Sequence, residues 1–254
     1  AEAVSELDER LLATPSLALQ RSHTVAAEMA ERSIRAMQNA LLSISAYTPE
    51  LAQSIRDDED ACDHYEDILG TYLVKLSARK LGENESEEAT ELLKSIGDFE
   101  RISDHAVNIL ESAEELRDKK LSFSDSAKGE FETLANALRE ILALSLRAFS
   151  TGDIAVASEV EPLEQVVDDL KDELRTRHIL RMKKGECSIE AGFVWSDLLT
   201  NLERASDHCS NVALCVLDLK KHTLSAHETQ HERKDVPEFA EHYRRYSEKY
   251  ALPL

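Results

Sequence analysis

The sequence is poor in the residues that interrupt helices. Its 254 residues include only 7 glycines and 5 prolines, and aromatic residues account for 5% of the chain. This scarcity argues against a fold with many tight turns, because turns depend on Gly and Pro. Ala, Leu, Glu, Asp, Lys and Arg dominate instead, and this composition is typical of long helices.

Positive charge is also scarce. The 30 Lys and Arg residues face 50 Asp and Glu residues, which gives a formal net charge of −20. Such a surface repels phosphate backbones and anionic lipid headgroups. The charge therefore argues against nucleic acid as a partner. The same excess destabilises the folded chain unless cations are held somewhere on it.

Cysteine pairs and long hydrophobic runs are absent as well. The four cysteines form no CxxC pair, which excludes a zinc ribbon and a disulfide scaffold and fits a reducing compartment. No stretch approaches eighteen uncharged apolar residues, and the first ten residues lack the pattern of a signal peptide. We therefore expect a soluble, cytoplasmic protein.

Apolar residues recur at helical spacing through most of the chain and predict an all-α fold. Turn and capping residues divide the pattern into six long helices, at about 16–46, 49–80, 86–119, 123–150, 153–185 and 188–221. Long helices with short connections favour two tandem antiparallel three-helix bundles. We assign residues 1–15 to a linker, 16–120 and 121–222 to two repeats, and 223–254 to a polar linker and a short C-terminal helix.

A repeated motif supports this division. The string ERISDH at 100–105 returns as ERASDH at 203–208, and both copies fit ERxSDHxxN. Internal duplication is the simplest explanation. The agreeing pairs are Glu100 with Glu203, Arg101 with Arg204, Ser103 with Ser206, Asp104 with Asp207, His105 with His208, and Asn108 with Asn211.

Each motif carries two carboxylates four residues apart, and the preceding helix of each repeat carries a pair at the same spacing. Like charges at this spacing destabilise a helix by roughly 0.2–0.5 kcal/mol. The two pairs of a repeat lie about equally far from the turn between their helices, so the hairpin brings four carboxylates to one level. The sets are Glu59, Asp63, Glu100 and Asp104, and Glu164, Asp168, Glu203 and Asp207.

Converging carboxylates predict two metal clusters. Oxygen-rich sites favour hard ions, and we consider Mg, Ca, Mn, Fe and Zn. Asn108 and Asn211, one turn further along, are candidate oxygen donors. The motif histidines are open to three interpretations: ligands, donors to ligands, or surface residues. The competing structural interpretation is that Arg101 and Arg204 pair with the carboxylates.

The duplicated unit, with ExxxD in its second helix and ERxxDHxxN in its third, resembles the PhoU family of regulators of bacterial phosphate uptake. The resemblance covers about residues 16–222. It implies a six-helix fold, multinuclear metal clusters on the eight carboxylates, and control of transport rather than catalysis. The family has Gly before its Asp-His, where this chain has Ser103 and Ser206.

Residues 7–19 resemble the segment that joins the membrane part of bacterial sodium/phosphate cotransporters to a cytoplasmic PhoU-like domain. The first residue is Ala1 rather than Met. We therefore expect a regulatory domain from such a transporter, at the cytoplasmic face of the inner membrane. Its expected partners are the transporter's membrane domain, inorganic phosphate and a second copy of the chain.

Two other functions remain open from the sequence. A metal-dependent phosphohydrolase would leave no trace of its activated water. A metal-free helical adaptor would use the carboxylates only for ion pairs. A di-iron oxidase is disfavoured, because no ExxH accompanies the matched pairs. No catalytic constellation is visible, and we expect a regulator rather than an enzyme, with phosphate completing the coordination of bound ions.

Overall fold

The structure is a computed structural model and describes residues 7–225 and 235–254. The described residues form helices joined by short connections, in agreement with the all-α prediction. The helices are η2 (Glu9–Ala13), α1 (Pro15–Ser43), α2 (Pro49–Ser77), α3 (Glu83–Asp118), α4 (Asp125–Thr151), α5 (Ile154–Lys183), α6 (Ile189–Ser225) and α7 (Asp235–Lys249).

Local chemistry explains several helix ends. The side chains of Thr48, Ser124 and Asp153 each accept a hydrogen bond from a backbone N–H of the first turn of α2, α4 and α5. Gly152, at φ 68°, ends α4 in the left-handed region that suits glycine. The predicted cap at Ser86 is wrong, because α3 already begins at Glu83, with Gly82 as its N-cap.

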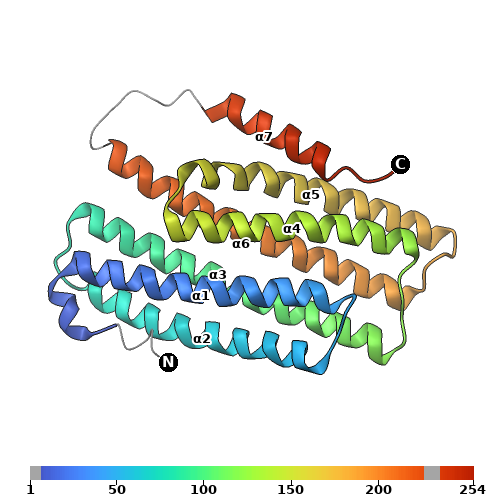
Figure 1. Cartoon of the computed structure of the whole chain (residues 1–254), viewed down its shortest axis with the longest axis horizontal. Helices are drawn as coiled ribbons and strands as arrows, with labels where there is room; N and C mark the ends of the chain where they lie inside the picture. The colour runs from blue at the N-terminus through green and yellow to red at the C-terminus, as the bar shows by residue number, and fades with distance from the viewer. Residues whose placement is uncertain (1–6, 226–234) are drawn as a thin grey trace.

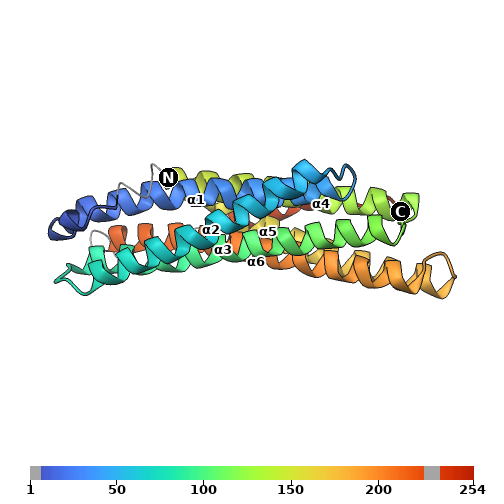
Figure 2. The same cartoon turned by 90° about the horizontal axis from the view of Figure 1, so that it is seen from below.

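The helices form the two predicted three-helix bundles. Helices α1, α2 and α3 pack together, as do α4, α5 and α6. The bundles lie side by side along their length, with α3 against α6 and α1 against α4, and the molecule is elongated (Figures 1 and 2). Helix α7 packs along α5. The third helices of the two repeats therefore form the centre of the molecule.

The segment assigned to an N-terminal linker is partly structured. Residues 1–6 lie outside the described residues, but η2 packs against the first bundle with Leu12 only 4% exposed. The Tyr72 hydroxyl donates to the Asp8 carbonyl oxygen at 2.9 Å. At the other end, α6 continues to Ser225, and the remaining part of the predicted linker, 226–234, lies outside the described residues.

None of the described helices is long and apolar enough to cross a membrane.

Candidate metal centre

Helices α2 and α3 bring five carboxylates together in the first repeat. Four of them are the predicted Glu59, Asp63, Glu100 and Asp104, and the fifth is Glu66 on α2. One carboxylate oxygen from each of Asp63, Glu66 and Glu100 lies within 4.8 Å of the other two. This is a set of hard oxygen donors, spaced closely enough to share a cation.

The electrostatics of this first cluster fit a cation. Burial raises the pKa of Glu59 to about 7, and the adjacent Asp104 carboxyl adds to the effect. Burial, with Asp104 as the next cause, raises the pKa of Glu100 to about 8. Partly buried carboxyls this close hold protons near neutral pH, because burial disfavours the charged form and neighbouring charges repel one another. A bound divalent or trivalent ion would replace those protons.

Glu66 is absent from the predicted set, although the sequence contained a signal for it. Glu59, Asp63 and Glu66 follow one another at i, i+4 and i+7, so all three lie on one face of α2. The ExxxD pattern ends at Asp63 and does not include Glu66. Its pKa is also raised, first by burial, while the Arg101 guanidinium acts in the opposite direction.

The second repeat brings its acids together around a lysine. Lys171 is 7% exposed, and its Nζ lies 2.8 Å from Asp168 Oδ1 and 3.3 Å from Glu203 Oε1. Burial alone would lower the pKa of Lys171, but hydrogen bonds to Asp168 and Glu203 raise it, so the amine stays charged. A cationic side chain therefore already neutralises two of the four predicted ligands.

The other two acids of the second repeat remain paired with each other. Burial raises the pKa of Glu164 to about 8, and the Asp207 carboxyl beside it is the next cause. The two clusters thus share one arrangement of four carboxylates and differ at one position. The residue three places after the α2 or α5 aspartate is Glu66 in the first repeat and Lys171 in the second.

The histidines and asparagines of the motif lie at the contact between the repeats. His105 Nδ1 lies 2.9 Å from Asn201 Oδ1, and the Asn108 amide donates to the same oxygen at 3.2 Å. The second copy repeats this pattern on Asp98, the residue equivalent to Asn201. The distances to Asp98 Oδ1 are 2.9 Å from His208 Nδ1 and 3.3 Å from Asn211 Nδ2.

The rings of His105 and His208 stack with their centroids 5.6 Å apart. Each motif therefore has two roles. Its Glu and Asp belong to the cluster of its own repeat, whereas its His and Asn bind the other repeat. Both asparagines, considered above as oxygen donors to metal, use their amide N–H groups in this contact.

Three other side chains that lie next to the predicted ligands in sequence are not ligands in this geometry. Arg101 and Arg204 are exposed, and neither forms an ion pair within 4 Å with any described residue. Cys62 lies between Glu59 and Asp63 in sequence but is buried on the core side of α2. Burial raises the pKa of the Cys62 thiol to about 12, so it remains protonated and cannot act as a thiolate ligand.

The fold and these clusters define a class: a duplicated helical-bundle protein with one carboxylate cluster in each repeat. A comparison with protein families identifies it further. The PhoU domain matches residues 26–113 and 131–216, one match in each bundle and together more than half of the chain. The chain belongs to the PhoU family.

Similar proteins include PhoU homologues of two bacteria. The phosphate-specific transport system accessory protein PhoU homolog 1 of Thermotoga maritima is 23% identical over 177 residues, which cover 69% of this chain and 75% of that protein. The accessory protein PhoU homolog of Borreliella burgdorferi is 25% identical over 195 residues, covering 73% and 85%.

Solved structures share the fold. PhoU from Pseudomonas aeruginosa matches with a TM-score of 0.67 and 21% identity, over 86% of this chain and 98% of that one. The phosphate transport system regulatory protein PhoU from Streptococcus pneumoniae matches with a TM-score of 0.69 and 20% identity, over 82% and 97%.

Proposed function

We propose that this protein is a metal-binding regulator of phosphate transport. Membership of the PhoU family supports the regulatory role, together with relatives named as accessory proteins of phosphate-specific transport. The observation that carries the metal-binding part is the convergence of five carboxylates between α2 and α3. In a chain of net charge −20, a bound cation also reduces the repulsion within the folded state.

The first cluster is the metal centre in this proposal. Glu59, Asp63, Glu66, Glu100 and Asp104 would hold the metal, and their oxygens suit Mg²⁺, Ca²⁺, Mn²⁺ or ferric iron. The metal would supply a positive charge at which inorganic phosphate can complete the coordination. The second cluster has Lys171 in the position of Glu66, so its carboxylates bind metal more weakly.

We further propose that the transporter partner is the membrane domain of a sodium/phosphate cotransporter, at the cytoplasmic face of the inner membrane. The support is the resemblance of residues 7–19 to the segment that joins the two parts in such transporters. Co-purification of this chain with the membrane domain tests the idea. Failure of the two proteins to associate both with and without Mn²⁺ contradicts this partner.

Elemental analysis tests the metal centre directly. The protein is purified without an affinity metal, beside the double variant Glu100→Gln/Asp104→Asn and its matched control Glu203→Gln/Asp207→Asn in the second repeat. We expect bound metal in the wild type and the control, and loss of metal in the first-repeat variant. Wild-type protein that takes up no Mn²⁺, Mg²⁺, Ca²⁺, Zn²⁺ or iron would make the metal proposal wrong.

A further inference from the structure

A cavity of about 240 Å³ lies at the end of the molecule where the α3–α4 and α5–α6 connections meet. Its lining includes Lys120 and Ser124 from the first connection, Arg181 from the last turns of α5, Ser188 just before α6, and Trp195 on α6. Its volume is below the roughly 300–1,000 Å³ of pockets for drug-sized ligands, so it suits a small ligand.

Two nitrogens of the lining residues have no acceptor among the described residues. These are Arg181 Nη2 and Trp195 Nε1, and the two residues are only 8% and 1% exposed. A buried donor without a partner is destabilising. Guanidinium and indole groups donate hydrogen bonds and accept none. The missing partner must therefore be an acceptor.

A third unpartnered nitrogen, His178 Nε2, belongs to the same lining but has a different neighbour. A Cβ at Gly192 would lie 3.0 Å from this atom, so the imidazole packs against the backbone of α6. It forms part of the cavity wall, whereas the unpartnered donors of Arg181 and Trp195 are the groups that a ligand would satisfy.

The charges around the cavity favour an anion. Arg181 Nη1 donates to Glu130 Oε2 at 2.9 Å, and Arg177 shares the same carboxylate at 3.3 Å. Arg177 also pairs with Glu173 at 3.1 Å, so Arg177 and Arg181 together balance Glu130 and Glu173. Lys120 adds another positive charge, against the single further carboxylate of Glu186 in the lining.

Serine hydroxyls supply further donors. Ser124 and Ser188 accept backbone hydrogen bonds from Ala127 and Ala191, as residues at the start of a helix do. An accepting hydroxyl oxygen leaves its proton available for another acceptor. Ser124 Oγ also lies 3.1 Å from Ser126 Oγ, where either oxygen can be the donor, so Ser188 is the serine of the two without a competing hydroxyl partner among the described residues. The lining therefore combines guanidinium, ammonium, indole and hydroxyl donors.

The connections at this end are also rich in basic residues for so acidic a chain. The sequence reads RDKKLS at 117–122 and RMKKGE at 181–186. Such a local concentration of positive charge attracts small anions toward the opening.

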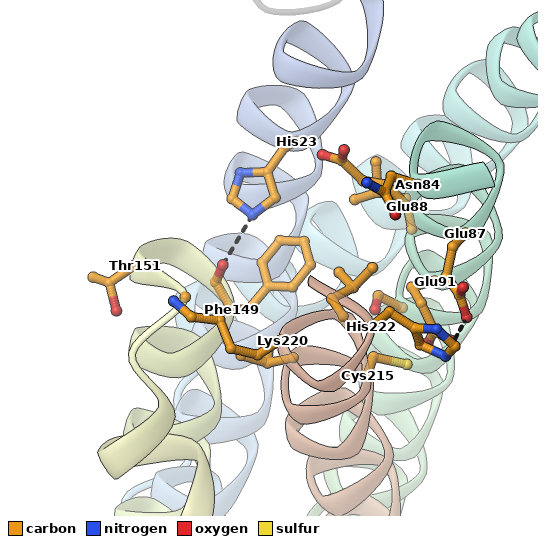
Figure 3. Close-up of a pocket in the computed structure, with 15 residues that line it drawn as sticks. His23, Asn84, Glu87, Glu88, Glu91, Phe149, Thr151, Cys215, Lys220 and His222 are labelled. Carbon is orange, nitrogen blue, oxygen red and sulfur yellow. Dashed lines mark hydrogen bonds and ion pairs between the residues drawn. The ribbon is translucent and has the colours of Figure 1, made fainter. Parts of the chain in front are cut away.

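A larger cavity, of about 340 Å³, shows the contrast (Figure 3). It lies where α1, α3, α4 and α6 meet, and three carboxylates line it: Glu87, Glu88 and Glu91. Glu91 Oε2 is buried there without a hydrogen-bond partner in the described chain. These carboxylates would repel an anion in the larger cavity. Of the two cavities, the smaller one is therefore the one suited to an anion.

We propose that the cavity around Arg181 and Trp195 binds a small tetrahedral oxyanion of the phosphate type. The oxygens would accept hydrogen bonds from Arg181, Trp195 and the serine hydroxyls, and Lys120 would balance the charge. The site shares no residue with the α2–α3 carboxylate cluster. It therefore goes beyond the proposed metal centre and does not require a bound metal.

The chain has a single tryptophan, and it lines this cavity, so its fluorescence reports on the site. The 254-residue chain is treated with EDTA and titrated with inorganic phosphate at constant ionic strength. We expect a saturable change in fluorescence, heat of binding in a calorimeter, and competition by sulfate, which accepts the same hydrogen bonds. No saturable response by either method, or no competition by sulfate, would overturn the proposal.

Variants locate the ligand. Arg181→Gln is expected to weaken phosphate binding about tenfold or more, the effect of losing a charged hydrogen bond. Lys120→Gln should also weaken binding. Because Lys120 is exposed, this variant tests the site even if the buried Arg181→Gln variant misfolds. Lys80→Gln, exposed on the distant α2–α3 connection, should leave binding unchanged.

Two results would contradict this location. Equal phosphate affinity in the wild type, Arg181→Gln and Lys120→Gln would show that phosphate does not bind in this cavity. Binding that appears only after Mn²⁺ is restored would assign phosphate to the metal centre instead. Because the titration uses metal-free protein, its failure leaves the elemental analysis of the first cluster unaffected, and the two proposals fail separately.

Discussion

At the scale of single residues, one position distinguishes the two carboxylate clusters. Glu66 adds a fifth negative charge to the first cluster, whereas Lys171 places an ammonium among the acids of the second. A lysine held within 3.4 Å of three carboxylates provides the neutralisation that a metal ion would otherwise provide. Under the proposed function, the duplicated halves therefore keep the same acids but differ in how strongly they would bind metal.

Exchanging these two residues should exchange the metal preference. Lys171→Glu gives the second cluster the charge of the first, and we expect its metal content per chain to rise above that of the wild type. Glu66→Lys should lower the metal content, because the new ammonium competes with the cation. Elemental analysis after dialysis against Mn²⁺ measures both effects.

Lys128→Glu, at an exposed position on α4, is the matched control for added negative charge. Its metal content should equal that of the wild type. If Lys171→Glu binds no more metal than this control, Lys171 is not the feature that limits the second cluster.

At the scale of helices, the sequence predicted most of the architecture. Helical spacing and turn residues located the six long helices, and the repeated motif supported their division into two three-helix bundles. The ExxxD spacing predicted that the two carboxylates of each pair share a helical face, and their equal distances from the turn predicted the register of each hairpin. These features are local or depend on equal distances from a turn.

These local features do not predict the contact between α3 and α6. Spacing shows that His105 points about 100° away from Asp104, but it does not show what the imidazole meets. The structure supplies Asn201 as its partner, ninety-six positions away in sequence. Likewise, the role of Lys171 depends on the position of Glu203 across the hairpin.

The α3–α6 contact should be sensitive to Asp98. This residue is 5% exposed and accepts from both His208 and Asn211. Asp98→Ala leaves two donors without a partner, which should lower the free energy of unfolding by about 1–3 kcal/mol. Asp98→Asn keeps an acceptor and reproduces the Asn201 arrangement, so it should cost less. Urea denaturation of the three proteins would show equal stabilities if this contact were unimportant.

The docking of α7 should depend on its buried tyrosines. Tyr246 is 3% exposed and donates to Glu159 on α5, while Tyr250 is 8% exposed and donates to Glu140 on α4. Tyr246→Ala removes a large buried ring, a change that typically costs about 3–5 kcal/mol in a core. We expect α7 to detach and become sensitive to limited proteolysis.

Phe239→Ala is the control for this variant, because Phe239 is on the same helix but 37% exposed. Its proteolysis rate should match that of the wild type. Equal rates for Tyr246→Ala and Phe239→Ala would show that Tyr246 does not hold α7 in place.

At the scale of the whole molecule, the acidic clusters link stability to pH and metal. The pKa of Glu100 is about 8 in the fold, against an ordinary value of 4.5, and that of Glu164 is also about 8. Between pH 4.5 and about pH 8, these two glutamates hold protons in the folded protein that they lose in the unfolded chain, so the folded state binds more protons. Stability must therefore fall as the pH rises.

This linkage predicts the behaviour of the metal-free protein. After EDTA treatment, its melting temperature should decrease as the pH rises from about 4.5 through 8 and change little from these groups at higher pH. Glu100→Gln, which cannot ionise, should flatten part of the decrease. Mn²⁺ should raise the melting temperature most at the alkaline end, where the carboxylates are ionised and can bind it. Calorimetric scans that show the same slope with and without Mn²⁺ would separate the pH dependence from the metal centre, and a slope unchanged in Glu100→Gln would remove the first cluster as its source.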